Sequence, residues 1–245
     1  MRTVLISDLH LTPDRQDIAQ AFFDFLHKTA SGADRLYILG DFFEYWLGDD
    51  TMDAFALQVA AALRNTSRYG TRVFLLHGNR DFLIGEAFCR QANCTLIPDP
   101  TKIELGGQPV LLMHGDTLCT DDVRYLRYRR IVRNSLVQKL FLASPAVLRR
   151  SVARSLRRNS SSAHSRTERP VFYDVTSQAV DAAMGTEIRL LIHGHVHRAA
   201  TYDLNGGRQR LVLGDWDKEG WYILHSHEGL FLKSFPIAAT SSVSP

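Results

Sequence analysis

The chain has 245 residues, of which 45% are hydrophobic and 22% charged, and its formal net charge is +3. This length and composition predict one large soluble domain, or one domain with an insertion, and exclude a mainly disordered chain or a fibrous repeat. No uncharged apolar stretch approaches the ~20 residues of a bilayer-spanning helix, and Asp8 and His10 interrupt the apolar start before a signal-peptide core forms. The three cysteines are odd in number and form no CxxC, which indicates reduced thiols in a cytosolic protein.

Short apolar runs of the β type alternate with helical patterns along the first half of the chain. We predict strands at 3–7, 35–39, 72–76, 109–113, 190–192 and 210–213. Residues 18–28 carry an apolar stripe at helical spacing, and 54–65 is similar. This alternation indicates an α/β core with crossover connections. The later runs 209–214, 220–225 and 230–235 predict antiparallel strands, and the tail 239–245 is expected to fray.

A strongly basic block interrupts this pattern. Residues 123–167 contain no Asp or Glu but enough Arg and Lys for a charge of about +12, which leaves about −9 on the rest of the chain. Helical patterns at 122–139 and 146–158 are broken at Ser144-Pro145, and a polar loop follows at 159–162. We therefore predict a helical insertion at 122–169 in a core formed by 1–121 and 170–238.

The basic block admits three interpretations. Its charges are compatible with helices whose basic faces are simply solvated. Apolar residues such as Val137, Leu140 and Phe141 beside the arginines favour an anionic membrane surface and an acyl-chain site. The interleaved Arg124, Tyr125 and neighbouring cations are instead typical of nucleic-acid binding.

Five of the predicted strands end in groups that can bind a metal ion. These groups are Asp8-Leu9-His10, Gly40-Asp41, His77-Gly78-Asn79-Arg80-Asp81, His114-Gly115-Asp116 and His193-Gly194-His195-Val196-His197. The carboxyl ends of strands form the ligand crevice of open α/β sheets, so we expect these groups to converge. Adjacent glycines allow close backbone approach. Alternate residues of an extended segment share one side, so His193, His195 and His197 are candidates to face one ion.

Each short motif alone is also typical of caps, turns or a surface, but all five at strand ends favour a metal site. Carboxylate, amide and imidazole ligands without a thiolate favour Mn²⁺, Fe²⁺ or Zn²⁺ over Ca²⁺. Two such ions a few ångströms apart can clamp a phosphate and lower the pKa of a bridging water. The residues therefore predict phosphate chemistry.

These motifs resemble the signature of the calcineurin-like metallophosphoesterases, from residue 3 to about 225. Residues 38–50, 77–83, 113–122 and 213–216 are similar to one branch of that family, the UDP-2,3-diacylglucosamine diphosphatases of lipid A biosynthesis, and this resemblance covers about 1–236. It implies an α/β fold, a βαβ sandwich of two mixed sheets flanked by helices, with the insertion as a helical cap over two acyl chains.

The resemblance also implies two Mn²⁺ ions. The first would take Asp8, His10, Asp41 and His197, and the second would take Asp41, Asn79, His114 and His195, so that Asp41 bridges them. His193 has no ligand role in the pattern, and we expect it to support the site or to pack.

The resemblance further implies catalytic roles for Asn79, Arg80 and His195. The residues similar to substrate contacts are Asn79, Arg80, Asp122, Ser160 and His195. Two more expected contacts depart from the pattern of the branch, since His164 stands where Asn is common and Thr167 where Lys is common. Arg166 is an alternative to Thr167 as the cation.

Arg80 bears on the choice of substrate. Many members of the family have His at this position, as the general acid, whereas Arg stays protonated and supplies no proton. A diphosphate expels a phosphate whose second pKa is about 6, which needs no acid. Arg80 is therefore predicted to pair with phosphate oxygens. A structural ion pair is the alternative.

The expected function is Mn²⁺-dependent hydrolysis of UDP-2,3-diacylglucosamine by metal-activated water at the α-phosphorus. The products would be UMP and 2,3-diacylglucosamine 1-phosphate (lipid X). We expect a cytoplasmic monomer, peripherally bound to the anionic cytoplasmic face of the inner membrane, with no nucleic-acid partner. The alternatives are a phosphodiesterase acting on nucleotides or nucleic acid, and a non-catalytic binding scaffold.

Overall fold

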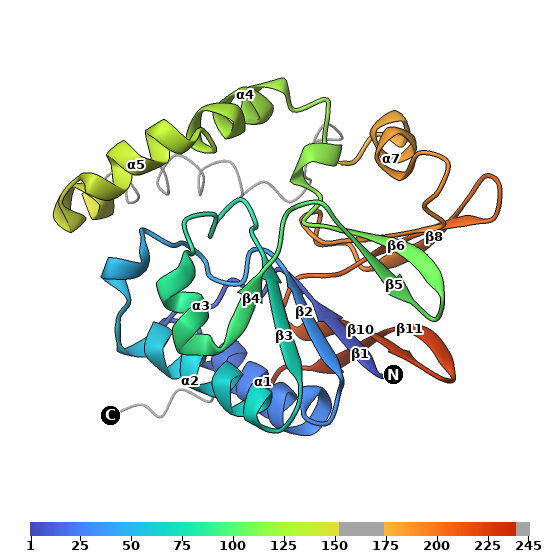
Figure 1. Ribbon diagram of the computed structural model, residues 1–245, viewed down its shortest axis with the longest axis horizontal. Helices are drawn as coiled ribbons and strands as arrows, with labels where there is room; N and C mark the ends of the chain where they lie inside the picture. Colours follow the sequence, from blue (N-terminus) through green and yellow to red (C-terminus); the bar gives the residue numbers. More distant parts are fainter. Residues whose placement is uncertain (152–173, 239–245) are drawn as a thin grey trace.

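Two mixed β-sheets face each other in the computed structural model, which describes residues 1–151 and 174–238 (Figure 1). The first sheet has the order β11-β10-β1-β2-β3-β4. Its strands are β1 (Thr3–Ile6), β2 (Arg35–Leu39), β3 (Arg72–Leu76), β4 (Cys94–Leu96), β10 (Glu219–Ser226) and β11 (Gly229–Pro236). Strands β1 to β4 are parallel, whereas β10 is antiparallel to β1 and β11. The predicted bounds of β2 and β3 are confirmed.

The second sheet has the order β5-β6-β7-β9-β8. Its strands are β5 (Thr101–Leu105), β6 (Gln108–Met113), β7 (Leu190–His193), β8 (Ala200–Leu204) and β9 (Arg208–Val212). The three central strands are parallel and the two edge strands antiparallel to their neighbours. The predicted antiparallel strands at 220–225 and 230–235 are confirmed as β10 and β11, and 209–214 forms β9, which is antiparallel to β8. Strand β9 joins the second sheet, where it is parallel to β7, while β10 and β11 pair in the first.

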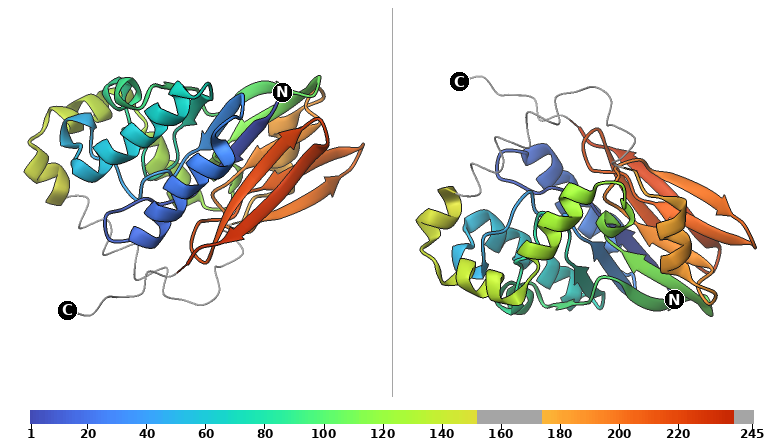
Figure 2. Two further views of the ribbon diagram at one scale, coloured as in Figure 1. Left: turned by 90° about the horizontal axis from the view of Figure 1, so that it is seen from below. Right: turned by 90° about the horizontal axis from the view of Figure 1, so that it is seen from above.

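Helices cover the outer faces of both sheets (Figures 1 and 2). On the first sheet lie α1 (Gln16–Phe25), which continues into a π-helical turn at Leu26–Ala30, α2 (Ala54–Arg68) and α3 (Glu86–Ala92). On the second sheet lies α7 (Ser177–Met184). The predicted apolar stripe is confirmed in α1, where Ile18, Phe22 and Phe25 are buried.

The apolar core forms three layers between these elements. Phe22 and Ile38 belong to the layer between the helices and the first sheet, and Leu39 and Leu112 to the layer between the sheets. Met184 packs in the layer between α7 and the second sheet. The central strands are buried on both faces, which explains their continuous apolar runs. The predicted α/β fold of two mixed sheets flanked by helices is therefore confirmed.

The described part of the insertion lies above the edge at which β1, β2 and β3 end (Figures 1 and 2). It consists of α4 (Val123–Val132), α5 (Ser135–Ala143) and a further helical segment at 146–151. The prediction of one helix over 122–139 is wrong, because the Asn134 side chain caps a new helix by accepting from the amides of Leu136 and Val137. The break at Ser144-Pro145 is confirmed.

Several predictions lie outside the described residues. They are the helix beyond residue 151, the loop at 159–162, the end of the insertion and the tail at 239–245. Within residues 1–151 and 174–238, no helix is both long and apolar enough to cross a membrane.

Candidate metal centre

Two clusters of metal-ligand side chains lie where the strands of both sheets end. Asp8, His10 and His197 form the first cluster, and Asp41, His114 and His195 form the second, with the ligand atoms of each cluster within 4.8 Å of one another. The seventh predicted ligand, Asn79, has its Oδ1 atom 2.8 Å from His114 Nε2. The structure therefore brings together all seven residues of the predicted ligand set.

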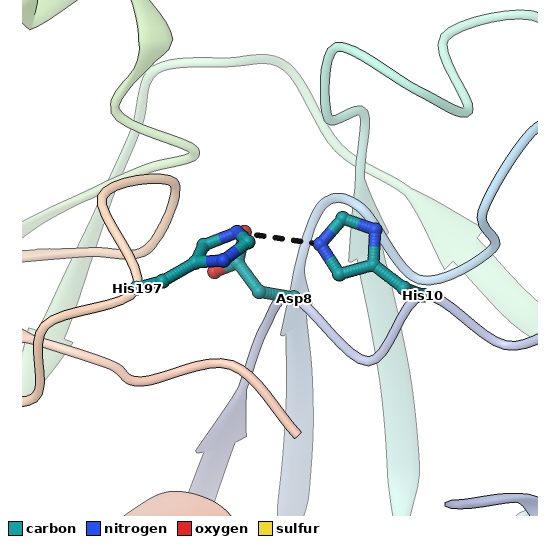
Figure 3. A group of neighbouring side chains, drawn as sticks. All are labelled: Asp8, His10 and His197. Atoms are coloured by element: carbon teal, nitrogen blue, oxygen red, sulfur yellow. Dashed lines mark hydrogen bonds and ion pairs between the residues drawn. The ribbon is translucent and has the colours of Figure 1, made fainter. Parts of the chain in front are cut away.

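The first cluster points its donor atoms at one small volume. The Nε2 atoms of His10 and His197 face each other at 3.3 Å, and Asp8 Oδ1 lies 3.4 Å from His197 Nε2. Figure 3 shows the three side chains directed toward one another, Asp8 and His10 from the segment after β1 and His197 from the segment after β7. Imidazole nitrogens and a carboxylate oxygen that converge in this way suit a divalent cation.

Asp41 lies between the two clusters. Its Oδ1 atom is 3.7 Å from His114 Nε2, and its Oδ2 atom is 4.0 Å from His10 Nε2. The buried carboxylate thus turns one oxygen toward each cluster. This geometry fits the bridging role that the resemblance implies.

The backbone is left-handed at five of the predicted ligands. The φ angles are 55° at Asp8, 49° at His10, 47° at Asp41, 70° at His195 and 57° at His197. Such a conformation costs a residue with a side chain about 1 kcal/mol or more. The surrounding structure supports this strain at the positions where side chains must turn from the strand direction into the site.

These angles also correct the expectation that His193, His195 and His197 face one ion. Alternation holds only along extended backbone, and the positive φ values at His195 and His197 end it. His195 consequently joins the second cluster and His197 the first. His193 remains in β7, fully buried, with its Nδ1 atom 2.9 Å from the carbonyl oxygen of Gly194.

Glycines allow the ligand loops to approach one another. A Cβ atom on Gly78 would lie 2.0 Å from the backbone nitrogen of Asp41, and one on Gly194 would lie 2.1 Å from Asp8 Oδ2. Both distances are far below van der Waals contact, so the close approach expected at these glycines is confirmed.

The environment of the imidazoles shows that the residues fit two divalent cations. The Nδ1 atoms lie 3.1 Å from Glu44 Oε2 for His10, 3.0 Å from the carbonyl oxygen of Leu39 for His114, and 3.3 Å from Asp215 Oδ2 for His197. An acceptor at Nδ1 orients the rings of His114 and His197 and leaves Nε2 for a metal ion, while the Glu44 carboxylate lies beside Nδ1 of His10.

The buried carboxylates of the site raise the pKa values of two of its histidines. Burial alone would lower the pKa of His114, but the carboxylates of Asp41 and Asp8 raise that pKa to about 9. Burial likewise opposes protonation of His197, but Asp215 and Asp8 raise its pKa to about 9. Two protonated imidazoles therefore stand where cations would bind.

The other two ligand groups shift in ways that also follow from burial. Burial, followed by the charge of His114, lowers the pKa of His195 to about 3, so this ring stays neutral. Burial raises the pKa of Asp41. A cation between the clusters would stabilise the Asp41 carboxylate.

Two predicted substrate residues have protein partners. Arg80 donates from Nη1 to Glu44 Oε1 at 2.8 Å, and its side chain remains 27% exposed. Asp122 caps α4 by accepting from the amide of Tyr125. A guanidinium has five donors, so the pair with Glu44 leaves others for a phosphate. The phosphate role of Arg80 and the substrate role of Asp122 stay predictions.

The remaining predicted substrate residues are Ser160, His164, Arg166 and Thr167. They lie outside the described residues.

The sequence reasoning missed a buried network beside the second cluster. The fully buried Asp116 accepts hydrogen bonds at Oδ2 from the Tyr125 hydroxyl and from Arg129 Nε. The Tyr125 ring stacks on His195, with 6.2 Å between centroids. Tyr125 and Arg129 are four residues apart on a helix, and Asp116 follows His114 in one motif, so the spacing held a signal for this network.

The missed acceptors Glu44 and Asp215 had a weaker signal. Both belong to segments that carry the family resemblance, but only the folded chain places them against His10 and His197.

Known proteins match this chain at two levels. The model of the calcineurin-like phosphoesterase family matches residues 1–199. The UDP-2,3-diacylglucosamine hydrolase of Azotobacter vinelandii is 52% identical over 241 residues, which cover 97% of this chain and 100% of the relative. The Pseudomonas aeruginosa protein of the same name is 50% identical with the same coverage.

A solved structure shares the fold. A dimetal phosphatase from Danio rerio has a TM-score of 0.53 at 12% identity, and the match covers 97% of this chain and 96% of that one. At this identity the similarity concerns the fold alone.

Proposed function

The chain belongs to the calcineurin-like phosphoesterase family and is a hydrolase, and we propose that it cleaves the diphosphate bond of UDP-2,3-diacylglucosamine. Attack at the α-phosphorus would release UMP and 2,3-diacylglucosamine 1-phosphate. The two curated relatives with that substrate in their names, 50% and 52% identical over nearly their full length, support this choice.

The observation that carries the proposal is the position of Arg80 at the metal centre. Its backbone amide donates to Asp41 Oδ1 at 2.8 Å, and its guanidinium is directed by Glu44, which also contacts His10. The sequence resemblance aligns Arg80 with the His that serves many phosphoesterases as proton donor, and we propose that Arg80 supplies positive charge instead. This charge suits a leaving group that is already a stable phosphate.

We assign the two ions to the clusters as Mn²⁺. Asp8, His10, Asp41 and His197 would hold one, and Asp41, Asn79, His114 and His195 the other. When bound, the ions supply Lewis acidity toward phosphate oxygens and toward water. The protein orients the imidazoles through Nδ1, turns Asp41 toward both ions and presents Arg80 to the phosphates.

The insertion and a neighbouring cavity support a substrate with acyl chains. Among the described residues, most of the large exposed apolar side chains lie in the insertion, between Val123 and Leu148. A cavity of about 300 Å³ is lined by apolar side chains that include Leu11, Phe43, Trp46 and Met52, and by Arg150 of the insertion. The exposed apolar and basic residues together suit an anionic membrane surface, and we propose that the enzyme binds there, at the cytoplasmic face of the inner membrane.

The arrangement of α4 weakens the alternative of a nucleic-acid phosphodiesterase. Tyr125 and Arg129, two members of the alternating aromatic and basic pattern, turn toward Asp116 rather than outward. A stacking platform for bases needs exposed aromatic rings next to cations. Of that pattern, Tyr128 is the one aromatic ring that remains exposed, with Arg124, Arg127 and Arg130.

Turnover with Mn²⁺ on three substrates tests the proposal. We expect hydrolysis of UDP-2,3-diacylglucosamine to exceed that of a nucleotide diester and of a phosphomonoester, with UMP as a product. A preference for either of the other two substrates would overturn the assignment. Co-sedimentation with anionic vesicles, weakened by salt, tests the membrane surface, and neutral vesicles serve as the control.

A further inference from the structure

The insertion contains a buried arginine that the metal centre does not use. The Arg149 side chain is only 2% exposed, although its helical segment is otherwise mostly exposed. Its guanidinium donates to both carboxylate oxygens of Asp50, to Oδ1 at 2.8 Å, and also to the carbonyl oxygen of Leu47. Its Nε donates to the carbonyl oxygen of Ser144 at 3.1 Å. None of these partners is a predicted metal ligand.

The core loop that receives Arg149 is shaped for it. Gly48 has a φ of 113°, and a Cβ atom there would lie 2.6 Å from Arg149 Nη1 and 2.7 Å from the Leu142 side chain. Any other residue would therefore strain the backbone and displace both side chains of the insertion.

The same loop is firmly tied to the core. Asp49, next to Gly48, accepts from Trp46 Nε1 at 2.9 Å and from the amides of Gly85 and Ala87 around the start of α3, at 2.9 and 2.8 Å. Arg149 is thus attached to a rigid part of the core.

The insertion is held at two separate places. Near the metal centre, Arg129 pairs with Asp116, and Arg133 donates to the carbonyl oxygen of Gly78 at 2.8 Å. Between these contacts and Arg149 lies α5, where Leu136 is 63% and Leu140 66% exposed. Apart from Phe141, which packs against the core, the intervening helix depends on its two ends for its position.

We propose that Arg149 is a positioning residue whose pair with Asp50 straps the far end of the insertion to the core. The strap sets how the insertion lies over the metal centre, and so it governs binding of the acyl part of the substrate rather than the phosphate chemistry. A bidentate guanidinium–carboxylate pair is directional. The same guanidinium also donates hydrogen bonds to the carbonyl oxygens of Leu47 and Ser144. The link to substrate binding rests on the proposed function, whereas the strap itself does not.

Three variants of the full chain separate the strap from surface charge. Arg149→Gln removes the charge and the fork, and Arg149→Lys retains the charge but loses bidentate geometry. Arg127→Gln removes the same charge from an exposed position of the insertion, and so measures the effect of surface electrostatics alone. Asp50→Asn removes the charge of the partner carboxylate, whose side chain is 60% exposed. This variant tests the strap even if Arg149→Gln does not fold.

Amide hydrogen exchange is the direct readout. We expect Arg149→Gln to accelerate amide exchange in α5 by about tenfold while β1 and β2 stay protected. The reason is that local opening of α5 no longer requires the Arg149–Asp50 pair to break. Arg149→Lys should give a smaller increase, and Arg127→Gln none. Unchanged exchange in α5 for both Arg149→Gln and Asp50→Asn would overturn the strap.

Kinetics and metal binding then test its role. We expect Arg149→Gln to raise KM for UDP-2,3-diacylglucosamine by about tenfold, with kcat and the Kd for Mn²⁺ changed by less than about threefold. A loss confined to kcat or to Mn²⁺ binding would refute the positioning role. If the wild-type protein does not hydrolyse this substrate, the proposed function fails, and hydrogen exchange still decides the strap.

Discussion

Arg129 donates from Nε to Asp116 Oδ2 at 2.6 Å, across the boundary between the insertion and the core. Asp116 is fully buried and follows His114 by two residues, and its other partner, Tyr125, stacks on His195. The first helix of the insertion is therefore joined to the residues that support the metal centre. Attachment of the insertion and integrity of the metal site are coupled through one carboxylate.

Replacing that carboxylate should destabilise the protein. Asp116→Ala leaves the 21% exposed Arg129 guanidinium and the Tyr125 hydroxyl without their acceptor. Breaking a buried ion pair from one side costs about 3 kcal/mol. We expect that decrease in the free energy of unfolding, measured by urea denaturation. Asp121→Ala, at an exposed position, should change it by less than ~0.5 kcal/mol. Equal effects of the two variants would contradict the coupling.

Asp41 should control the metal content of both clusters. Because the Asp41 carboxylate turns one oxygen toward each cluster, Asp41→Asn should weaken the binding of both ions. We expect fewer than two bound Mn²⁺ ions per chain after dialysis, and a loss of turnover of about 100-fold or more. Atomic absorption measures the metal content, and an assay of UMP release measures turnover. Asp14→Asn, which alters an exposed carboxylate, should retain the wild-type content. Retention of both ions by Asp41→Asn would refute the bridge.

Metal binding should release protons at neutral pH. The raised pKa values of His114 and His197, both about 9, mean that these rings hold a proton below pH 9 in the metal-free protein and lose it above. His195, with a pKa lowered to about 3, is already neutral and releases none.

The sign of the pH dependence follows directly. Each entering ion must displace a proton from His114 or His197, so apparent affinity for Mn²⁺ should weaken as pH falls from 9 to 7. Calorimetric titration at pH 7.5 in two buffers of different ionisation enthalpy should give different heats, with about two protons released per chain. Equal heats in both buffers, or an affinity that does not change with pH, would count against protonated imidazoles.

Gly194 should be intolerant of a methyl group. A Cβ atom there would lie 2.1 Å from both Asp8 Oδ2 and Ser7 Oγ, so Gly194→Ala must displace the Asp8 carboxylate. We expect affinity for Mn²⁺ to fall by about tenfold or more, as measured by calorimetry. Gly107→Ala is the control, because no atom lies within 4 Å of its added Cβ and only the strain of its φ of 80° remains. Wild-type metal affinity in Gly194→Ala would contradict the packing argument.

Arg80 should matter for turnover more than for metal binding. Arg80→His removes the permanent charge that we assign to the phosphates but none of the predicted metal ligands. We expect kcat on UDP-2,3-diacylglucosamine to fall by about 100-fold while the Kd for Mn²⁺ changes by less than about threefold. Glu44→Gln, which leaves the Arg80 charge in place, should reduce kcat less. A normal kcat in Arg80→His would exclude the phosphate role.

Much of the fold and of the site was predictable because the relevant signals are local. Strands β2 and β3 are apolar runs buried on both faces and ended by turn residues, so their bounds followed from the sequence. The seven predicted ligands followed from chemistry-bearing residues at strand ends, since parallel strands bring these ends together. Asn134 shows the limit of such signals. The apolar and basic pattern of a helix continues through this residue, and only the backbone geometry reveals that Asn134 caps a new helix.

Which residues pair across the fold was decided by tertiary structure. Arg149 lies 99 residues from Asp50, and neither has a sequence signal that selects the other among many charges. The division of the histidines between two clusters has the same origin. The left-handed backbone at His195 and His197 exists because packed loops outweigh its local strain, with Gly194 against Asp8 and Gly78 against Asp41. The amino-acid sequence alone determined which side chains reach this edge of the sheets, and close packing decided where each one points.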